Sequence, residues 1–230
     1  WHPSLAPVLV IADPETTVGL PRGLTAATGM DALSHAIEAY SAKGFHPMCD
    51  GIAIEAMRLV RKSLVRACEE PTDLEARSDM LVAASMGAVA FQKGLGVLHA
   101  IAHPLGGLTD LHHGTLNAIL LPHVIRYNRQ ALVERADRLA RWLDLDAPRH
   151  DAERSGTSPV GWGVDALLAW VDDLRSRLAI PARLADLGVS PDVIPEVARR
   201  APEDPSFANN PITPTQADLE GILRAAIEGG

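Results

Sequence analysis

Apolar residues recur at helical spacing through most of this chain from residue 24 onward. Leu33, Ile37 and Tyr40, for example, lie three or four positions apart and so share one face of a helix. The pattern predicts helices at residues 24–42, 48–68, 97–106, 113–127, 131–143 and 164–178. We therefore expect an all-α fold.

Helix-start signals add three further elements to this pattern. The stretch TDLE from Thr72 is typical of a capping box and predicts a helix starting there. Ser190-Pro191 and Thr213-Pro214 have the order of an N-cap residue and a first-turn proline, and they predict the last two helices. Residues 150–163 are polar and rich in turn formers, which indicates a surface loop.

One segment at the start departs from the helical pattern. Val8, Leu9, Val10 and Ile11 form a continuous apolar run, as in a strand buried on both faces of a parallel sheet. A single strand cannot form a sheet, and the chain opens on Trp1 rather than on Met. We expect residues 1–21 to be the last strand and crossover of a preceding domain, and residues 22–230 to be an all-helical domain.

Composition excludes several classes of function. The chain has 230 residues with 47% hydrophobic content, enough for one substantial core. A net charge of -8 argues against nucleic acid as a partner. No apolar run approaches the roughly 20 residues of a membrane span, so we expect no membrane partner. The two cysteines, Cys49 and Cys68, are too few for a disulfide framework, which favours the cytoplasm.

A cluster of metal-binding side chain types stands out in the first half. Asp31 and His35 lie four residues apart, one helical turn, and five of the nine histidines fall within residues 99–123. Burying Asp31 on a helix of small and apolar residues is costly without a cation or hydrogen-bond donors. One carboxylate with imidazoles suits Fe²⁺ or Zn²⁺ better than Mg²⁺ or Ca²⁺. We infer a metal centre that acts as a Lewis acid.

Spacing alone leaves the remaining ligands open. His99 and His103 are also one helical turn apart, so both are candidates, as in other helical two-histidine motifs. His112 and His113 are consecutive at a predicted helix start, so at most one of them reaches the same metal. Glu38 follows His35 by three residues; it is a candidate acceptor for a ligand imidazole, although we favour a structural salt bridge.

Two segments resemble a known family. GLTAATGMDALSHAIEAY and GLGVLHAIAHPLGGLTDLHHGTLNAILLPHVIRYN closely resemble the metal-binding domain of the iron-containing alcohol dehydrogenase family, and the later half, including FANNPITPT, resembles it more loosely. The resemblance implies that the metal ligands are Asp31, His35, His99 and His113. It places His103 beside the nicotinamide and the substrate, as a catalytic and cofactor-binding residue, and gives no ligand role to His112 or His123.

The resemblance also implies an architecture and a reaction. The fold is expected to be a multi-helical domain like the C-terminal domain of dehydroquinate synthase, after an α/β domain that binds the dinucleotide. The cofactors are expected to be Fe²⁺, with Zn²⁺ as the alternative, and NAD or NADP. The reaction is the reversible oxidation of a small alcohol to an aldehyde or ketone. We also expect a homo-oligomer.

The dinucleotide site itself has no counterpart in the sequence. No glycine-rich turn follows a strand, and Gly94 and Gly96 lack the third glycine of the dinucleotide fingerprint. We expect these two glycines to loosen the entry to the histidine helix, and we expect the chain alone to be inactive.

Related enzymes and one unrelated class are the alternatives. Glycerol-dehydrogenase-like and dehydroquinate-synthase-like enzymes share the expected architecture. Maleylacetate reductases typically lack the aspartate, so Asp31 favours a metal-dependent alcohol dehydrogenase. The alternative from a different functional class is a stand-alone helical metal-binding module without catalysis.

Overall fold

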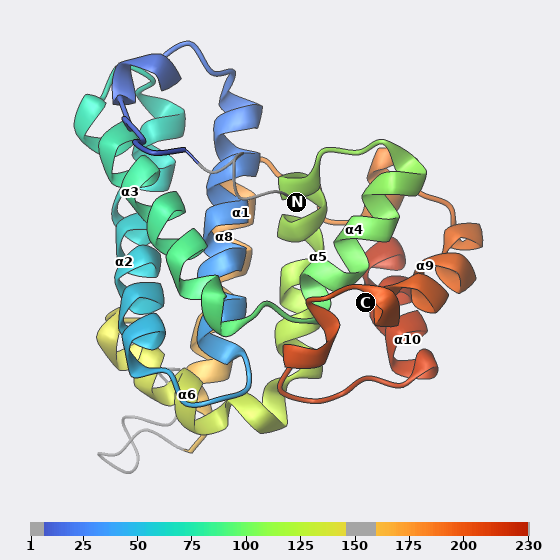
Figure 1. Cartoon of the computed structure of the whole chain (residues 1–230). Coiled ribbons are helices and arrows are strands. Elements are labelled where there is room, and N and C mark those ends of the chain that lie inside the picture. Colours follow the sequence, from blue (N-terminus) through green and yellow to red (C-terminus); the bar gives the residue numbers. More distant parts are fainter. Residues whose placement is uncertain (1–6, 146–159, 230) are drawn as a thin grey trace, which may run out of the picture.

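A computed structural model describes residues 7–145 and 160–229 of the chain. Every regular element in these residues is helical, which confirms the predicted all-α fold (Figure 1), although the one predicted strand is missing. The main helices are α1 (Arg22–Ser41), α2 (Pro47–Glu69), α3 (Leu74–Ala90), α4 (Val97–Thr109), α5 (His113–Tyr127), α6 (Arg129–Trp142), α8 (Trp162–Arg177), α9 (Ile194–Arg200) and α10 (Gln216–Glu228). Short 3₁₀ turns join several of them.

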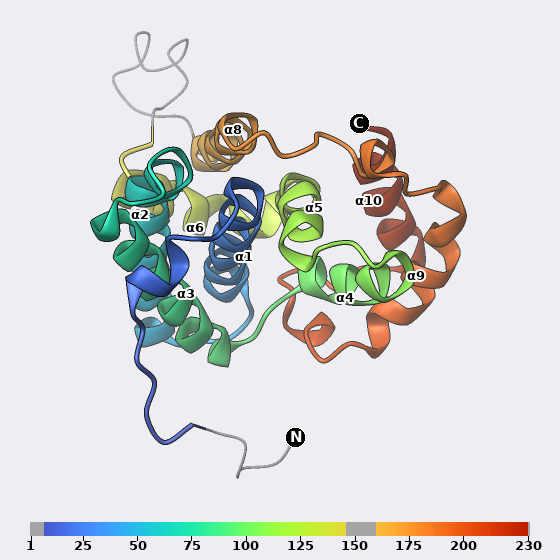
Figure 2. The ribbon, with the colours of Figure 1, turned by 90° about the horizontal axis from the view of Figure 1, so that it is seen from above.

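Helix α1 lies in the interior of the fold. It packs against α2 and α3 on one side and against α5 on the other, and Figure 2 shows it surrounded by these neighbours. Small buried residues such as Ala26, Ala36 and Ala39 let the neighbouring helices come close. Helices α4, α9 and α10 form a second group beyond α5 (Figure 2). The fold therefore places α5 between α1 and α4.

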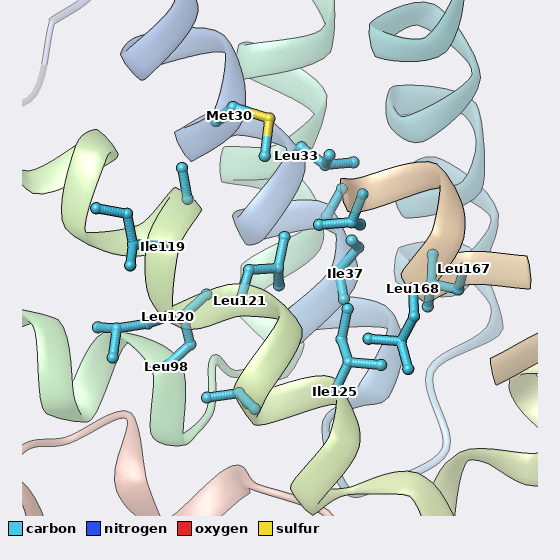
Figure 3. Close-up of a cluster of buried hydrophobic side chains, with 14 of the residues drawn as sticks. Met30, Leu33, Ile37, Leu98, Ile119, Leu120, Leu121, Ile125, Leu167 and Leu168 are labelled. Atoms are coloured by element: carbon cyan, nitrogen blue, oxygen red, sulfur yellow. The ribbon is translucent and has the colours of Figure 1, made fainter. Parts of the chain in front are cut away.

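The buried core fixes the position of α5 against α1. Three of the helices that contribute to it face one another in Figure 3, through Met30, Leu33 and Ile37 of α1, Leu121 and Ile125 of α5, and Leu167 and Leu168 of α8. Each fully buried side chain of this size stabilises the fold by about 1.5–3 kcal/mol relative to exposure. Displacing α5 along α1 would expose several of them together, so the register of the two helices is well determined.

The predicted first strand is not formed. Residues 7–13 have no regular structure, and the side chains of Val8, Leu9, Val10 and Ile11 are largely exposed. The physical reason is that a strand needs the backbone of a partner strand, and residues 7–145 and 160–229 contain none.

Two helix starts differ from the prediction by one or two residues. Asp73, not Thr72, caps α3, and its carboxylate accepts from the backbone of Ala76 at 3.0 Å. Helix α10 is capped by Thr215, two residues after Thr213, in a capping box with Asp218. In both places the sequence offers two capping side chains close together, and only the geometry of the incoming chain selects one.

The other boundaries follow the sequence more closely. Ser190 accepts from the backbone of Asp192, as an N-cap residue does, although the first turn behind it is 3₁₀ and α9 begins only at Ile194. Residues 150–159 of the predicted loop lie outside the described residues, and α8 begins at Trp162.

In the described part of the chain, no single helix has the length and apolarity needed to cross a membrane. Residues Leu74–Lys93 and Val97–Thr109 reach those values only as a pair, across a bend of 110°.

Candidate metal centre

Four side chains predicted as metal ligands lie close together, with Asp31 between the three imidazoles. Asp31 and His35 come from α1, His99 comes from α4, and His113 is the first residue of α5. The Oδ1 atom of Asp31 lies 3.9 Å from Nε2 of His35, 3.8 Å from Nε2 of His99 and 3.5 Å from Nε2 of His113. One possible ligand atom from each of Asp31, His35 and His99 lies within 4.8 Å of the others. The fold thus brings together one carboxylate and three imidazoles from three helices.

Close contact between α1 and α5 produces this convergence. A Cβ atom at Gly114 would lie 2.2 Å from the carbonyl oxygen of Ala27, so only glycine fits at this helix crossing. Ala27 is one turn before Asp31 on α1, and Gly114 directly follows His113. The left-handed Asp110, with φ of 57°, ends α4 and lets the chain turn back into α5. Local sequence therefore sets the separation of the Asp31 and His113 side chains.

The charges of Asp31, His35 and His99 suit a divalent cation. Burial alone would raise the pKa of Asp31, but the nearby imidazoles of His99 and His35 and the hydrogen bond from Asn117 lower it well below its usual range. Burial lowers the pKa of His35 to about 4. Burial also opposes the charged form of His99, yet the carboxylates of Asp31 and Glu38 raise its pKa to about 9. An ionised carboxylate thus lies beside the lone pairs of a neutral imidazole, and His99 lies between two carboxylates that favour positive charge.

One face of the centre is open to solvent. His99 is only 1% exposed, whereas 39% of the His113 side chain is exposed. His103 lies on this open side, and its ring stacks on that of His113 with centroids 5.3 Å apart. Nδ1 of His103 lies 2.7 Å from Oδ2 of Asp204, which leaves Nε2 as the ring atom without this partner. His103 is therefore beside the centre, while the three imidazoles within 4.0 Å of Asp31 belong to other residues.

The two remaining histidines of the cluster lie elsewhere on α5. His112 is its exposed N-cap residue, and its side chain makes no capping hydrogen bond. His123 is buried further along the helix, where burial, followed by the charges of Arg126 and Arg175, lowers its pKa to about 4. Neither contacts Asp31 in the way that His113 does. Of the two consecutive histidines His112 and His113, only His113 therefore faces Asp31.

Asn117 lies among the candidate ligands, although the sequence pattern did not predict it there. Its Nδ2 atom lies 2.7 Å from Oδ1 of Asp31, 2.9 Å from Nε2 of His113 and 3.2 Å from Nε2 of His99. Its Oδ1 atom is buried with no hydrogen-bond partner among the described residues. The amide thus places a donor where the lone pairs of three candidate ligands meet, which is the environment that a cation requires. Its spacing of four residues from His113 was the available signal.

Glu38 contacts the imidazole of His99, a candidate metal ligand, directly. Its Oε2 atom lies 2.7 Å from Nδ1 of His99, and the side chain is 4% exposed. The predicted salt bridge of Glu38 is present, and its partner is His99, which is itself one of the candidate metal ligands. The contact is to His99 rather than to His35, because Glu38 faces the start of α4.

The two glycines before α4 are not loosening elements, and that expectation was wrong. A Cβ atom at Gly96 would lie 2.6 Å from Oε1 of Glu38, and one at Gly94 would lie 2.6 Å from Cγ of Asn209. Gly94 also has a φ of 131°, a backbone conformation that residues with a side chain rarely adopt. Both glycines instead allow other residues to pack closely against the chain.

Comparison with known proteins places these residues in a family. The sequence profile of the Fe-containing alcohol dehydrogenase family, C-terminal, matches residues 25–227. The chain is 41% identical to a 4-hydroxybutyrate dehydrogenase of Cupriavidus necator and 39% identical to an NAD-dependent methanol dehydrogenase of Bacillus methanolicus, with 99% and 97% of the chain covered. It spans 57% of the length of each of these relatives.

A solved structure shows the same similarity. The crystal structure of a 1,3-propanediol oxidoreductase matches with a TM-score of 0.86 and 37% identity. The match covers 94% of this chain and 55% of the other.

Proposed function

The chain belongs to the iron-containing alcohol dehydrogenase family, and from this we propose that it supplies the metal and substrate half of an NAD(P)-dependent alcohol dehydrogenase active site. The observation that carries this proposal is that the Nε2 atoms of His35, His99 and His113 each lie within 4.0 Å of Oδ1 of Asp31. Residues 22–230 are the all-helical metal-binding domain in this account, and residues 1–21 lead into it from a preceding domain.

The four residues form an N3O donor set for Fe²⁺, with Zn²⁺ as the alternative. A divalent cation held there would lower the pKa of an alcohol hydroxyl and would polarise a carbonyl group. Asp31 contributes the negative charge, and the burial of His99 excludes water from the inner side of the centre. The exposed side of His113 is where a substrate can approach, because the opposite side is closed by the core.

His103 has a separate role in this proposal. Asp204 holds its ring through Nδ1, so Nε2 is the atom available to exchange a proton with the substrate or to contact the nicotinamide. The stacking of His103 on His113 keeps that atom next to the open side of the metal centre. We therefore propose His103 as the catalytic and cofactor-side residue.

Relatives support the choice of cofactor and substrate class. One relative is named as NAD-dependent, and the names of the three compared proteins refer to methanol, 1,3-propanediol and 4-hydroxybutyrate. We propose a small alcohol or aldehyde as the substrate and NAD or NADP as the hydride carrier. The homo-oligomer and the cytoplasmic location remain predictions.

Titration calorimetry and activity measurements test this division of labour. The chain alone should oxidise no small alcohol and bind NAD and NADP weakly, because dinucleotide binding uses a glycine-rich turn and a helix N-terminus that we expect in a preceding domain. Extending the chain at its N-terminus by roughly 100–200 residues should restore turnover. Micromolar binding of NAD to the chain alone would contradict the domain assignment. An extended, metal-loaded protein without turnover on small alcohols would favour the stand-alone metal-binding module.

A further inference from the structure

Glu38 is a buried carboxylate that the metal-ligand set does not include. It lies on α1 and reaches the first residues of α4 with both oxygen atoms. Oε1 accepts from the backbone N–H of Leu98 at 2.8 Å, and Oε2 accepts from that of Gly96 at 2.9 Å. Oε2 also lies 2.7 Å from Nδ1 of His99. One side chain thus holds both the start of the helix and the imidazole on its first turn.

These contacts explain how a carboxylate can be buried here. An isolated charge in the interior is costly, and donors from the positive end of a helix offset that cost. The side chain needs close approach to reach them, and Gly96 provides the space, since a Cβ atom there would lie 2.6 Å from Oε1. Charge, helix start and glycine therefore form one arrangement around Glu38.

The contact with His99 has a consequence for the metal centre. When Nδ1 donates to a carboxylate, Nε2 is the nitrogen left for a metal. Nε2 of His99 does face the centre, 3.8 Å from Oδ1 of Asp31. A carboxylate on the far nitrogen fixes the ring orientation and makes the imidazole a stronger ligand.

We propose that Glu38 is a positioning residue of the metal centre, which sets the orientation and ligand strength of His99 through the Nδ1 contact. The effect on metal affinity rests on the proposed metal-binding function, whereas the contact between Glu38 and His99 does not. Removing the charge of Glu38 is therefore expected to weaken metal binding although Glu38 does not touch the metal.

A purely structural role of Glu38 as a helix cap is the competing explanation, and Asn210 offers a matched control. Oδ1 of Asn210 accepts from the backbone of Val97 at 3.2 Å, so this residue holds the same helix start. The hydrogen bonds recorded for its side chain go to Val97, Asn128 and Ile212, not to His99. Asn210→Ala should thus weaken the start of α4 without removing the partner of the His99 ring.

The experiment compares Glu38→Gln with Asn210→Ala. Competition titrations with Zn²⁺ and Co²⁺ give the affinity of each protein, and the visible spectrum of bound Co²⁺ reports the ligand geometry. Proton NMR of the metal-free protein with ¹⁵N-labelled histidine follows the His99 Nδ1–H. We expect Glu38→Gln to bind metal about 10- to 100-fold more weakly and to move the downfield Nδ1–H signal upfield. Asn210→Ala should lower the melting temperature and keep the affinity within about twofold of the wild type.

Each result bears on a different claim. Equal metal affinities in wild type and Glu38→Gln, with lower stability in both variants, would overturn the proposal and leave Glu38 as a cap. If Glu38→Gln does not fold, the absence of a carboxylate-bonded His99 Nδ1–H signal from the wild type would itself refute the contact. A wild type that binds no metal but shows this signal would contradict the proposed metal centre and retain the Glu38–His99 contact alone.

Discussion

Gly114→Ala tests whether the geometry of the proposed metal site depends on the close contact of α5 with α1. The new Cβ atom would lie 2.2 Å from the carbonyl oxygen of Ala27, 2.8 Å from its carbonyl carbon and 3.3 Å from Cβ of Asp31. Favourable separations between non-bonded carbon atoms are about 3.5–4.0 Å. The two helices must therefore move apart by roughly 1 Å, because a backbone carbonyl within a helix cannot rotate away as a side chain can.

Two opposing effects set the magnitude. Alanine is favoured over glycine in a helix by about 1 kcal/mol, and overpacking costs about 1–3 kcal/mol. The clash involves backbone, so we expect the upper end of that range and a net loss of about 2 kcal/mol. For a protein of this size the melting temperature should fall by about 4–8 °C. Gly221→Ala in α10, where no atom lies within 4 Å of the new Cβ, is the matched control and should be neutral or stabilising.

Thermal unfolding and metal titration of both variants provide the assay. Gly114→Ala should lose stability and metal affinity together, since Asp31 and His113 lie on either side of the contact. Gly221→Ala should lower neither the stability nor the metal affinity. A Gly114→Ala protein that is as stable as the wild type, with unchanged metal affinity, would refute the reasoning.

Two further predictions concern histidines outside the ligand set. His103→Ala should retain the metal while an N-terminally extended enzyme loses turnover or cofactor affinity; a loss of metal as large as in His99→Ala would make His103 a ligand. His123 has a pKa of about 4 in the folded protein against 6.5 ordinarily, so the unfolded chain binds more protons between these values and stability falls as the pH decreases from 6.5 to 4. In His123→Gln the urea midpoint should fall less over this window, and an equal fall would contradict the assignment.

The helical content was predictable because long amphipathic periods leave few alternatives. Residues 113–127 were predicted with the bounds that α5 has, and the other long helices differ by one to three residues at most ends. The strand prediction for residues 8–11 was wrong because an apolar run forms a strand only if a partner strand is present. The prediction of the helix cap was wrong where two suitable side chains stand close together, as at Thr72 and Asp73.

The candidate site was predictable in its chemistry more than in its membership. Spacing identified Asp31 and His35 as a pair. The choice of His99 and His113 among the other histidines depends on how three helices cross, and helical periodicity does not specify that arrangement. Asp204 follows His103 by 101 residues, and no local pattern joins them. Asn117 and Glu38 did carry a signal at helical spacing, although polar residues at such spacing are more often exposed.

Anaerobic titration with Fe²⁺ or Zn²⁺, followed by elemental analysis, tests the central claim most directly. The account predicts one divalent metal per chain in the wild type. His99→Ala and His113→Ala should each lose more affinity than the roughly 10- to 100-fold that outer partners cost. His112→Ala, which removes the exposed neighbour of His113, should bind as the wild type does. Unchanged metal uptake in His99→Ala and His113→Ala would contradict the account.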